Sequence, residues 1–116
     1  MYLEHQESAD SNFSDLPHEQ GVEESKKFSM HSVSSYASEL SYAGYWSVPL
    51  AYIKTTLDKV VPPEGQQGMI DFVSQGGEYK VDVHEFASGH NPHASQPENI
   101  GKILVKAVEG LLARGA

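Results

Sequence analysis

Cysteine is absent from the 116 residues of the sequence. Disulfides, thiolate metal sites and a cysteine nucleophile are therefore excluded, and a reducing compartment suits the chain. No apolar run approaches the roughly 18 residues that a membrane-spanning helix needs. The first residues, MYLEHQESAD, also lack the basic and apolar regions of a signal peptide. We therefore expect a soluble, cytoplasmic protein that makes no use of a membrane.

Positive charge is scarce in this chain. Lys and Arg together number 8 against 16 Asp and Glu, which gives a formal net charge of -8. The first 25 residues contain no Lys or Arg. Their acidic side chains are Glu4, Glu7, Asp10, Asp15, Glu19, Glu23 and Glu24. Because such a segment repels phosphate backbones and anionic lipids, we expect neither nucleic acid nor a membrane surface to be a partner.

The N-terminal part of the chain has little apolar periodicity. Residues 1–12 are polar and unpatterned, so we expect an irregular acidic N-terminus. Residues 13–45 carry helical signals, with Ser14 or Asp15 as an N-cap and Pro17 in the first turn. Short helical turns follow, and their narrow apolar stripe consists of Val33, Tyr36, Ala37 and Leu40.

Residues 46–116 alternate between strand and helix patterns. Residues 48–56 are almost continuously apolar, which is typical of a strand buried on both faces. Residues 79–86 alternate as a half-exposed strand does, and residues 64–75 between the two favour a helix that a pair of glycines ends. The resulting order predicts an α/β fold with two parallel strands joined by a right-handed crossover.

The closing helix has the most regular pattern in the sequence. Ser95 and Glu98 have the spacing of a capping box, Pro97 lies in the first turn, and Gly115 ends the helix. Its apolar positions are Ile100, Ile103, Leu104, Ala107, Leu111 and Leu112.

Two parallel strands do not make a sheet with both faces covered, so we expect an incomplete fold. The first strand keeps an unpaired edge, and such an edge invites self-association or pairing with a separate polypeptide. An incorrectly bounded gene product, with its remaining part upstream, is another interpretation of the same pattern.

A carboxylate and an imidazole follow the two predicted strands. Asp58 comes just after the first strand and His90 just after the second. Parallel neighbours bring the loops beyond their carboxyl ends to one rim, where functional side chains gather. A carboxylate that holds one ring nitrogen leaves the other free to take a proton from a nucleophile. The alternatives are a turn position for Asp58 and a polar loop position for His90.

The stretches VPLAYIKTTLDKVVPPEGQQGMIDF and VDVHEFASGHNPHASQPENIGKIL resemble the C-terminal portion of the α/β-hydrolase fold family. The likeness is to fungal and bacterial serine esterase-type members related to plant methyl-ester esterases and hydroxynitrile lyases. In that family a VPxxYI…xD..xP…Q..M stretch brings the triad acid, and an aGHxPxxSqPexva stretch brings the triad histidine. The resemblance implies that Asp58 stands at the triad acid position and His90 at the triad base position. Residues 13–45 more weakly resemble the end of the lid and the return to the core, which would make them a lid-like helical remnant.

The same resemblance implies hydrolysis of small ester or related carbonyl substrates by a Ser-Asp-His mechanism, without a cofactor. The family's nucleophile lies in a G-x-S-x-G elbow upstream of the acid, and no serine here has that context. Ser74, in FVSQG, lacks the first glycine and follows Asp58. We therefore expect the nucleophile to be absent. Because the triad and the oxyanion hole act as a unit, we also expect the chain alone to show no measurable esterase activity. A fungal secondary-metabolite pathway is a family-level expectation.

Other residues allow other interpretations. His84, His90 and His93 invite a metal site, but His84 points away from the loop and no acidic third ligand completes the set, so we expect none. A non-catalytic interaction protein that uses the exposed sheet edge is the alternative function. The aromatic residues that suit either a pocket lining or ordinary packing are Tyr36, Tyr42, Tyr45 and Trp46.

Overall fold

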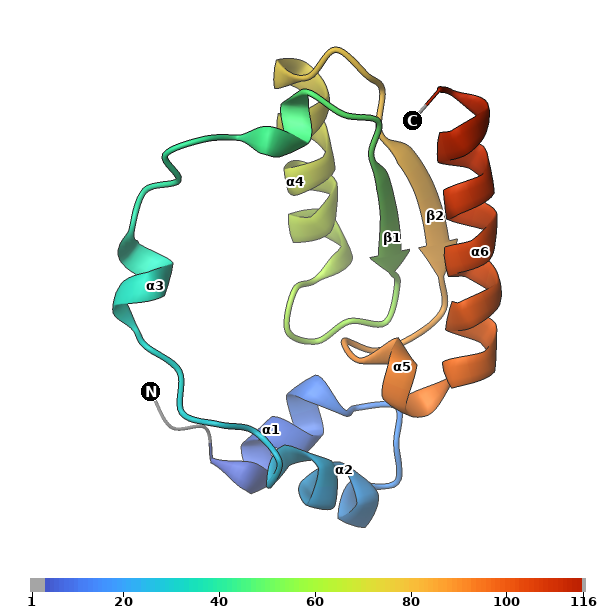
Figure 1. Ribbon diagram of the computed structural model, residues 1–116. Coiled ribbons are helices and arrows are strands. Elements are labelled where there is room, and N and C mark those ends of the chain that lie inside the picture. The colour runs from blue at the N-terminus through green and yellow to red at the C-terminus, as the bar shows by residue number, and fades with distance from the viewer. Residues whose placement is uncertain (1–3, 116) are drawn as a thin grey trace.

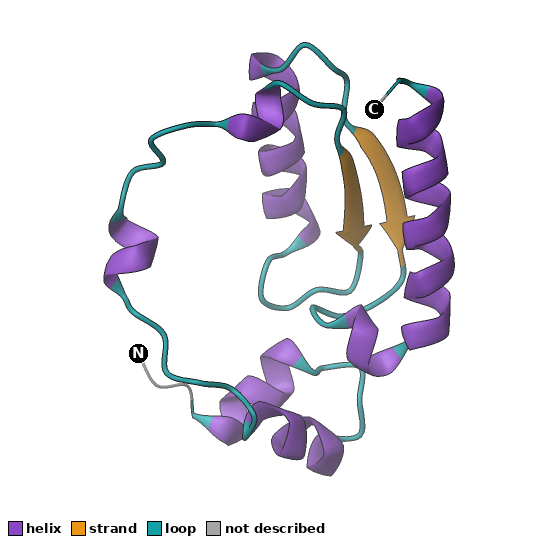
Figure 2. Cartoon of the chain, in the orientation of Figure 1, coloured by secondary structure: helices purple, strands orange, loops and turns teal. Residues whose placement is uncertain are grey.

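The computed structural model describes residues 4–115 of the chain. Short helices precede a two-stranded sheet, and a longer helix comes after each strand (Figure 1, Figure 2). None of the helices in this range is long and apolar enough to cross a bilayer. The elements are α1 (His5–Asn12), α2 (His18–Ser25), α3 (Ser34–Ala37), the 3-10 helix η1 (Gly44–Trp46), β1 (Ala51–Thr55), α4 (Pro63–Gly76), β2 (Asp82–Phe86), α5 (Pro92–Ser95) and α6 (Pro97–Ala113).

The sheet consists of β1 and β2, which pair in parallel from Ala51 opposite Asp82 to Thr55 opposite Phe86. α4 connects the strands, and Figure 1 shows the pair lying between α4 and α6. α4 packs on β1, while α6 contacts both strands. The chain is therefore mixed α/β, and the predicted order of strand, helix, strand and helix is confirmed.

α4 begins and ends for identifiable reasons. Pro63 opens it, since the fixed φ of proline suits the first turn of a helix. At the other end, a Cβ on Gly76 would collide with the indole of Trp46, whose ring centroid lies 5.9 Å from that of Phe72. The Trp46 carbonyl also accepts the Glu78 N–H at 3.3 Å. The segment before β1 is thereby fastened to the C-terminal end of α4.

The apolar core is small, and the prediction that residues 48–56 form a strand buried on both faces is wrong. β1 is shorter, and its first four residues are only half-buried. Two strands with a helix beside each leave much of the sheet uncovered. Large apolar side chains of α6 also stay exposed, namely Leu104, Val105, Val108 and Leu112. The buried apolar side chains are Ala9, Phe13, Ile70, Val81, Ile100 and Ala107.

The N-terminus is not irregular as residues 1–12 predicted, because α1 begins at His5; residues 1–3 lie outside the described range. The Glu4 carboxylate caps this helix by accepting the Gln6 and Glu7 N–H groups at 2.8 and 3.2 Å. α1 then packs closely on α2, since a Cβ on Gly21 would lie 3.3 Å from the Ala9 Cβ. Tertiary packing thus supports a helix whose own sequence is too polar to predict it.

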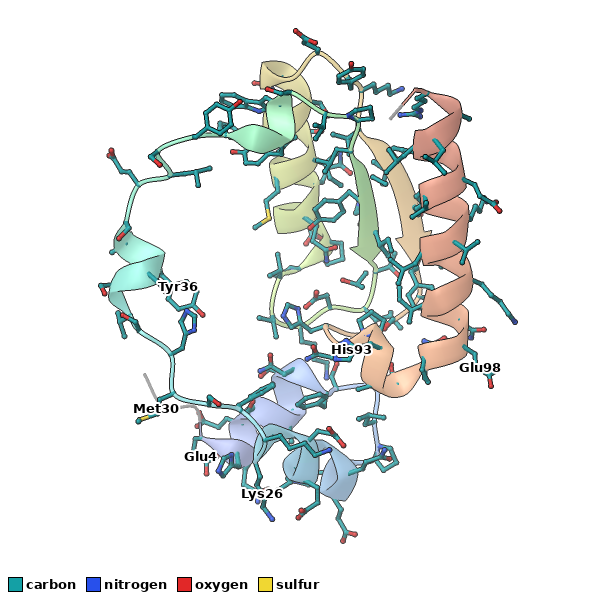
Figure 3. All side chains as sticks on the ribbon, viewed as in Figure 1. Glu4, Lys26, Met30, Tyr36, His93 and Glu98 are labelled. Atoms are coloured by element: carbon teal, nitrogen blue, oxygen red, sulfur yellow. The ribbon has the colours of Figure 1, made fainter. Side chains whose placement is uncertain are left out.

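The segment between α2 and β1 forms the short helical turns that were predicted, α3 and η1. The apolar stripe expected along it is wrong, because residues 26–42 are all exposed. Figure 1 shows the segment arching away from the rest of the chain, and the exposed side chains of Met30 and Tyr36 are labelled along it in Figure 3. Within residues 4–115, the side chains of the predicted stripe thus stay exposed.

Two predicted helix caps are wrong for one shared reason. α2 begins at His18, so neither Ser14 nor Asp15 caps it, and α6 has no side-chain cap although Ser95 and Glu98 have the capping-box spacing. The Ser95 hydroxyl instead donates to Asp15 Oδ2 at 2.7 Å. The long-range bond between these two residues replaces the local bonds that each was expected to make.

Candidate active site

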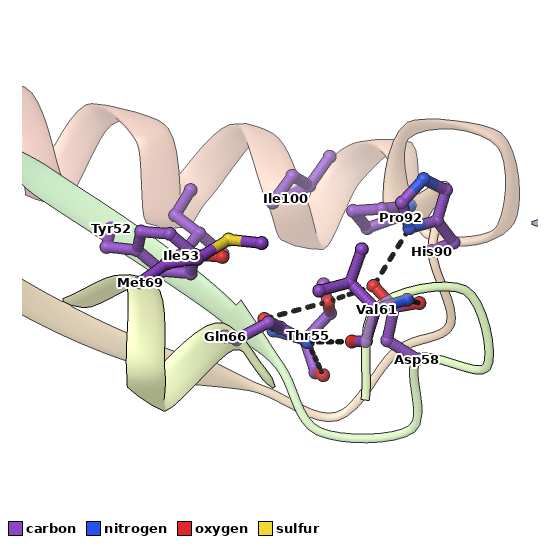
Figure 4. A pocket seen from close by; sticks show the side chains of 10 residues that line it. All are labelled: Tyr52, Ile53, Thr55, Asp58, Val61, Gln66, Met69, His90, Pro92 and Ile100. Atoms are coloured by element: carbon purple, nitrogen blue, oxygen red, sulfur yellow. Dashed lines mark hydrogen bonds and ion pairs between the residues drawn. The ribbon is translucent and has the colours of Figure 1, made fainter. Parts of the chain in front are cut away.

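Asp58 and His90, hereafter the dyad, meet just beyond the carboxyl ends of β1 and β2 (Figure 4). His90 Nδ1 lies 2.9 Å from Asp58 Oδ2. The Asp58 side chain is 4% exposed and that of His90 is 32% exposed, so the acid is enclosed and the imidazole is accessible. The parallel pairing of the strands brings the two predicted residues together, as their positions after the strands indicated.

The Asp58 carboxylate is held on both of its oxygens. Oδ1 accepts the Val60 and Val61 N–H groups at 2.8 and 2.9 Å, while Oδ2 accepts the Thr55 hydroxyl at 2.9 Å besides His90. Burial raises the pKa of Asp58, but the hydrogen bonds from His90, the two N–H groups and Thr55 outweigh it. The pKa therefore lies below the ordinary value of 3.8. Asp58 is an anion at neutral pH.

The charge of Asp58 fixes the tautomer of His90. A carboxylate can only accept hydrogen bonds, so the shared proton belongs to His90 Nδ1. In the neutral imidazole Nε2 then carries the lone pair, and no hydrogen bond to Nε2 comes from residues 4–115. A histidine oriented in this way can act as a general base through Nε2.

Gln66, which is 2% exposed, holds the Asp58 turn against β1. Its Oε1 accepts the Thr55 N–H at 2.9 Å, and its Nε2 donates to the carbonyls of Thr55 and Val61 at 2.8 and 2.7 Å. The first turn of α4 is thereby joined to the strand end and to the turn that follows it. Sequence reasoning assigned Gln66 no role in the site, although it belongs to the stretch that resembles the triad-acid motif.

Asp15 holds the loop that carries His90, and it was also missed as a site residue. Asp15 Oδ2 accepts the Gly89 N–H at 2.9 Å, the Ser88 hydroxyl at 3.1 Å and the Ser95 hydroxyl at 2.7 Å. Burial raises the pKa of Asp15, but the hydrogen bonds from Gly89, Ser95 and Ser88 together lower it by more. The pKa therefore lies below the ordinary value. No local sequence signal links residues so far apart along the chain.

A pocket of about 300 Å³ opens beside the dyad. Burial and then the charge of Asp58 raise the pKa of Tyr52, which keeps its hydroxyl protonated. The lining is mostly apolar around a few polar groups, as is usual for small-molecule sites. The lining residues are Tyr52, Ile53, Thr55, Asp58, Val61, Gln66, Met69, His90, Pro92 and Ile100 (Figure 4).

A second and more apolar pocket, of about 670 Å³, shares Tyr52 and Met69 with the first. Of the aromatic residues considered above, Tyr45 lines this pocket, while Tyr36 and Tyr42 are exposed. An apolar surface therefore continues from the dyad along α4. The other lining residues are Leu50, Gly65, Gly68, Phe72 and Val73.

Neither pocket that opens on this surface is lined by a serine or a cysteine from residues 4–115. Ser74 lies in α4, and its hydroxyl donates to the Ile70 carbonyl at 2.7 Å. The hydroxyl nearest to the acid is that of Thr55, which is buried and donates to Asp58. The part of the chain that the structure describes thus offers a base without a nucleophile placed to use it.

The other histidines of the predicted cluster lie on β2 and in α5. His84 is on β2, where its Nε2 atom lies 3.2 Å from Asp82 Oδ2, and His93 is in α5. Across residues 4–115, no three His, Cys, Asp or Glu side chains gather as metal ligands would.

Part of a curated fungal protein is similar in sequence to this chain. It is 31% identical over 106 residues to a probable hydrolase, R7, of Phoma sp.. The aligned region takes in 91% of this chain and 43% of the relative, so the chain spans less than half the length of the curated relative it matches. Neither a protein-family model nor a solved structure matches the chain. The similarity is thus to part of a protein named as a probable hydrolase, and it specifies neither a fold nor a substrate.

Proposed function

We propose that this chain contributes the acid and the base of a Ser-Asp-His hydrolase site with the α/β-hydrolase fold. In this proposal Asp58 is the triad acid and His90 is the triad base. The substrate is a small ester or a related carbonyl compound. The observation that carries the proposal is the 2.9 Å hydrogen bond between an enclosed carboxylate and an accessible imidazole whose Nε2 is unbonded within residues 4–115.

The chemistry follows from the orientation of the imidazole. His90 Nε2 takes the proton of a serine hydroxyl as its oxygen attacks the substrate carbonyl carbon, and the Asp58 anion stabilises the imidazolium that forms. His90 then returns the proton to the leaving alcohol, and the acyl group stays on serine. Water releases the acid in a second round of the same proton transfers. The apolar surface lined by Tyr52 and Met69 suits the hydrocarbon part of such a substrate.

The nucleophile and the oxyanion hole belong, in this proposal, to a part of the catalytic unit that these 116 residues do not contain. Two members of a triad give little catalysis without the third and without oxyanion stabilisation. The chain alone is therefore expected to hydrolyse p-nitrophenyl acetate no faster than background. A link to fungal secondary-metabolite pathways belongs to the same proposal.

A transplant into the relative tests the proposal directly. The region of the Phoma hydrolase that aligns with this chain is replaced by the chain, and hydrolysis of p-nitrophenyl esters is measured beside the intact relative. We expect the chimera to be active and His90→Ala to lower its kcat by about 10⁴ or more. An active chimera whose rate is unchanged by His90→Ala contradicts the proposal, as does a folded but inactive chimera beside an active relative.

A second candidate function is self-association through the unpaired edge of β1. The sheet described in residues 4–115 has only two strands, so one edge of each is unpaired. Exposed apolar side chains on both long helices, such as Phe72 of α4 and Val105 of α6, add surface that favours association.

A further inference from the structure

The loop that carries His90 depends on a contact from the other end of the chain. His90 lies between β2 and α5, in a stretch without regular secondary structure, and its own side chain bonds only Asp58 within the described range. A loop of this kind does not fix an imidazole by itself, since catalytic geometry tolerates errors of only about 0.5 Å. One restraint is the Leu57 N–H, which donates to the Ser88 carbonyl at 3.1 Å, and a further restraint comes from outside the two strand-end loops.

Asp15 supplies that restraint through one oxygen atom. Its three donors come from Ser88 and Gly89 immediately before His90 and from Ser95 at the end of α5, so they hold the loop on both sides of the imidazole. Because the acceptor is an anion, these hydrogen bonds are stronger than bonds between neutral groups. Ser88 is completely buried, and its hydroxyl has the Gly89 carbonyl, at 3.0 Å, as its other acceptor.

The close approach of the two segments shows that the contact shapes the loop. A Cβ on Gly89 would lie 2.9 Å from Asp15 Oδ1 and 3.0 Å from Ser14 Oγ. Glycine at this position is therefore what allows the backbone beside His90 to reach the carboxylate. A second tie runs in parallel, as Asn91 Nδ2 donates to the Asn12 carbonyl at 2.8 Å.

We propose that Asp15 is a positioning residue for the dyad: its carboxylate fixes the loop of residues 88–95 so that His90 keeps Nδ1 on Asp58 and Nε2 open to substrate. The importance of this role for catalysis rests on the proposed function, in which His90 is the triad base. Within residues 4–115, Asp15 makes no hydrogen bond to the imidazole and does not line the pocket, so it acts through the loop. The N-terminal helices are then part of the site, although their sequence contributes no catalytic group.

The test uses the full chain labelled with ¹⁵N in its histidines, with His90 assigned from a His90→Gln variant. The ring nitrogen shifts give the tautomer, and the hydrogen-bonded Nδ1–H proton reports the contact with Asp58. We expect Asp15→Ala to lose that proton signal and to give a mixture of tautomers. Asp15→Asn keeps an oxygen acceptor but loses the charge and has two lone pairs for the three donors, so it is expected to restore the native signals in part. The matched control is Ser25→Ala, which removes bonds to the carbonyls of His5 and Val22 without touching the loop.

Native His90 signals in folded Asp15→Ala overturn the inference, and so does the same loss of signal in Ser25→Ala. If Asp15→Ala fails to fold, Ser95→Ala removes the shortest of the three bonds, and a native His90 spectrum in that variant is the contrary result. The spectra need no catalysis, so an inactive chimera with an Asp15-dependent His90 would refute the proposed function and leave the positioning role standing.

Discussion

Gln66 faces Thr55 with both ends of its side-chain amide, accepting the Thr55 N–H and donating to the Thr55 carbonyl. The two residues belong to different elements, and both are buried. The amide therefore substitutes for a neighbouring strand at the point where β1 ends, and it places the Asp58 turn that follows. This relationship makes Gln66 an indirect support of Asp58, the acid half of the dyad.

Gln66→Leu should lower the free energy of unfolding by about 3 kcal/mol, because it leaves the buried Thr55 N–H and two carbonyls without partners. Urea denaturation followed by circular dichroism measures the change. The control is Gln67→Leu. Exposed Gln67 bonds Lys54 and Asp71 at the surface, so its replacement should shift stability by about 0.5 kcal/mol or less. Equal effects of the two substitutions would contradict the role assigned to Gln66.

Acid should unfold the chain partly through Asp58. Its pKa is lowered in the folded state, so the ionised form stabilises the fold above the ordinary value of 3.8, and this stabilisation is lost as pH falls through the lower folded value. Unfolding free energies from pH 6 down to pH 3 should decrease less steeply in Asp58→Asn than in the native chain. Asp71→Asn, which alters an exposed carboxylate of α4, should leave the slope unchanged. Parallel curves for Asp58→Asn and the native chain would disprove this linkage.

The meeting of Asp58 and His90 was predictable, because strand patterns and parallel order fix where the loops after each strand lie. The two structural supports of the dyad were not. Asp15 has the local pattern of a helix cap, and its actual partners are some 73 to 80 positions away. Ser95 is equally misleading in the sequence, since its spacing to Glu98 fits a capping box. A local rule cannot anticipate that two such residues bond each other.

The N-terminal helix shows the same limit in another form. α1 has no apolar stripe, and its cap is Glu4, which is not among the residues usually preferred there. Ala9 is buried only because Gly21 allows α2 to approach. The expected burial of β1 was wrong because a partner is missing. Its apolar sequence suits a neighbouring strand on each side, and the described sheet provides one neighbouring strand. Periodicity predicts what a segment can bury, and the available partners decide what it does bury.

Gly89→Ala should disturb the contact between Asp15 and the His90 loop, although it adds only one methyl group. The added Cβ meets Asp15 Oδ1 and Ser14 Oγ, so we expect a loss of about 1–3 kcal/mol in unfolding free energy. The His90 Nδ1–H signal should weaken with it. Gly101→Ala is the matched control, because nothing lies within 4 Å of a Cβ there and alanine favours the interior of α6. That control should gain roughly 0.5–1 kcal/mol. A gain in stability from Gly89→Ala would refute the close approach described here.

If the chain self-associates through the unpaired edge of β1, blocking that edge should keep it monomeric. Leu50 O and Thr56 N bond β2, so by the alternation of a strand the Ile53 N–H faces the outer edge. Light scattering at increasing concentration should show dimers or larger species. Ile53→Pro removes the outward donor and should return the chain to a monomer. Ile53→Ala loses the same side chain but keeps the N–H, and it should still associate. A well-folded native monomer at all concentrations removes self-association as a function of this edge, whereas a monomeric Ile53→Ala would assign it to the side chain.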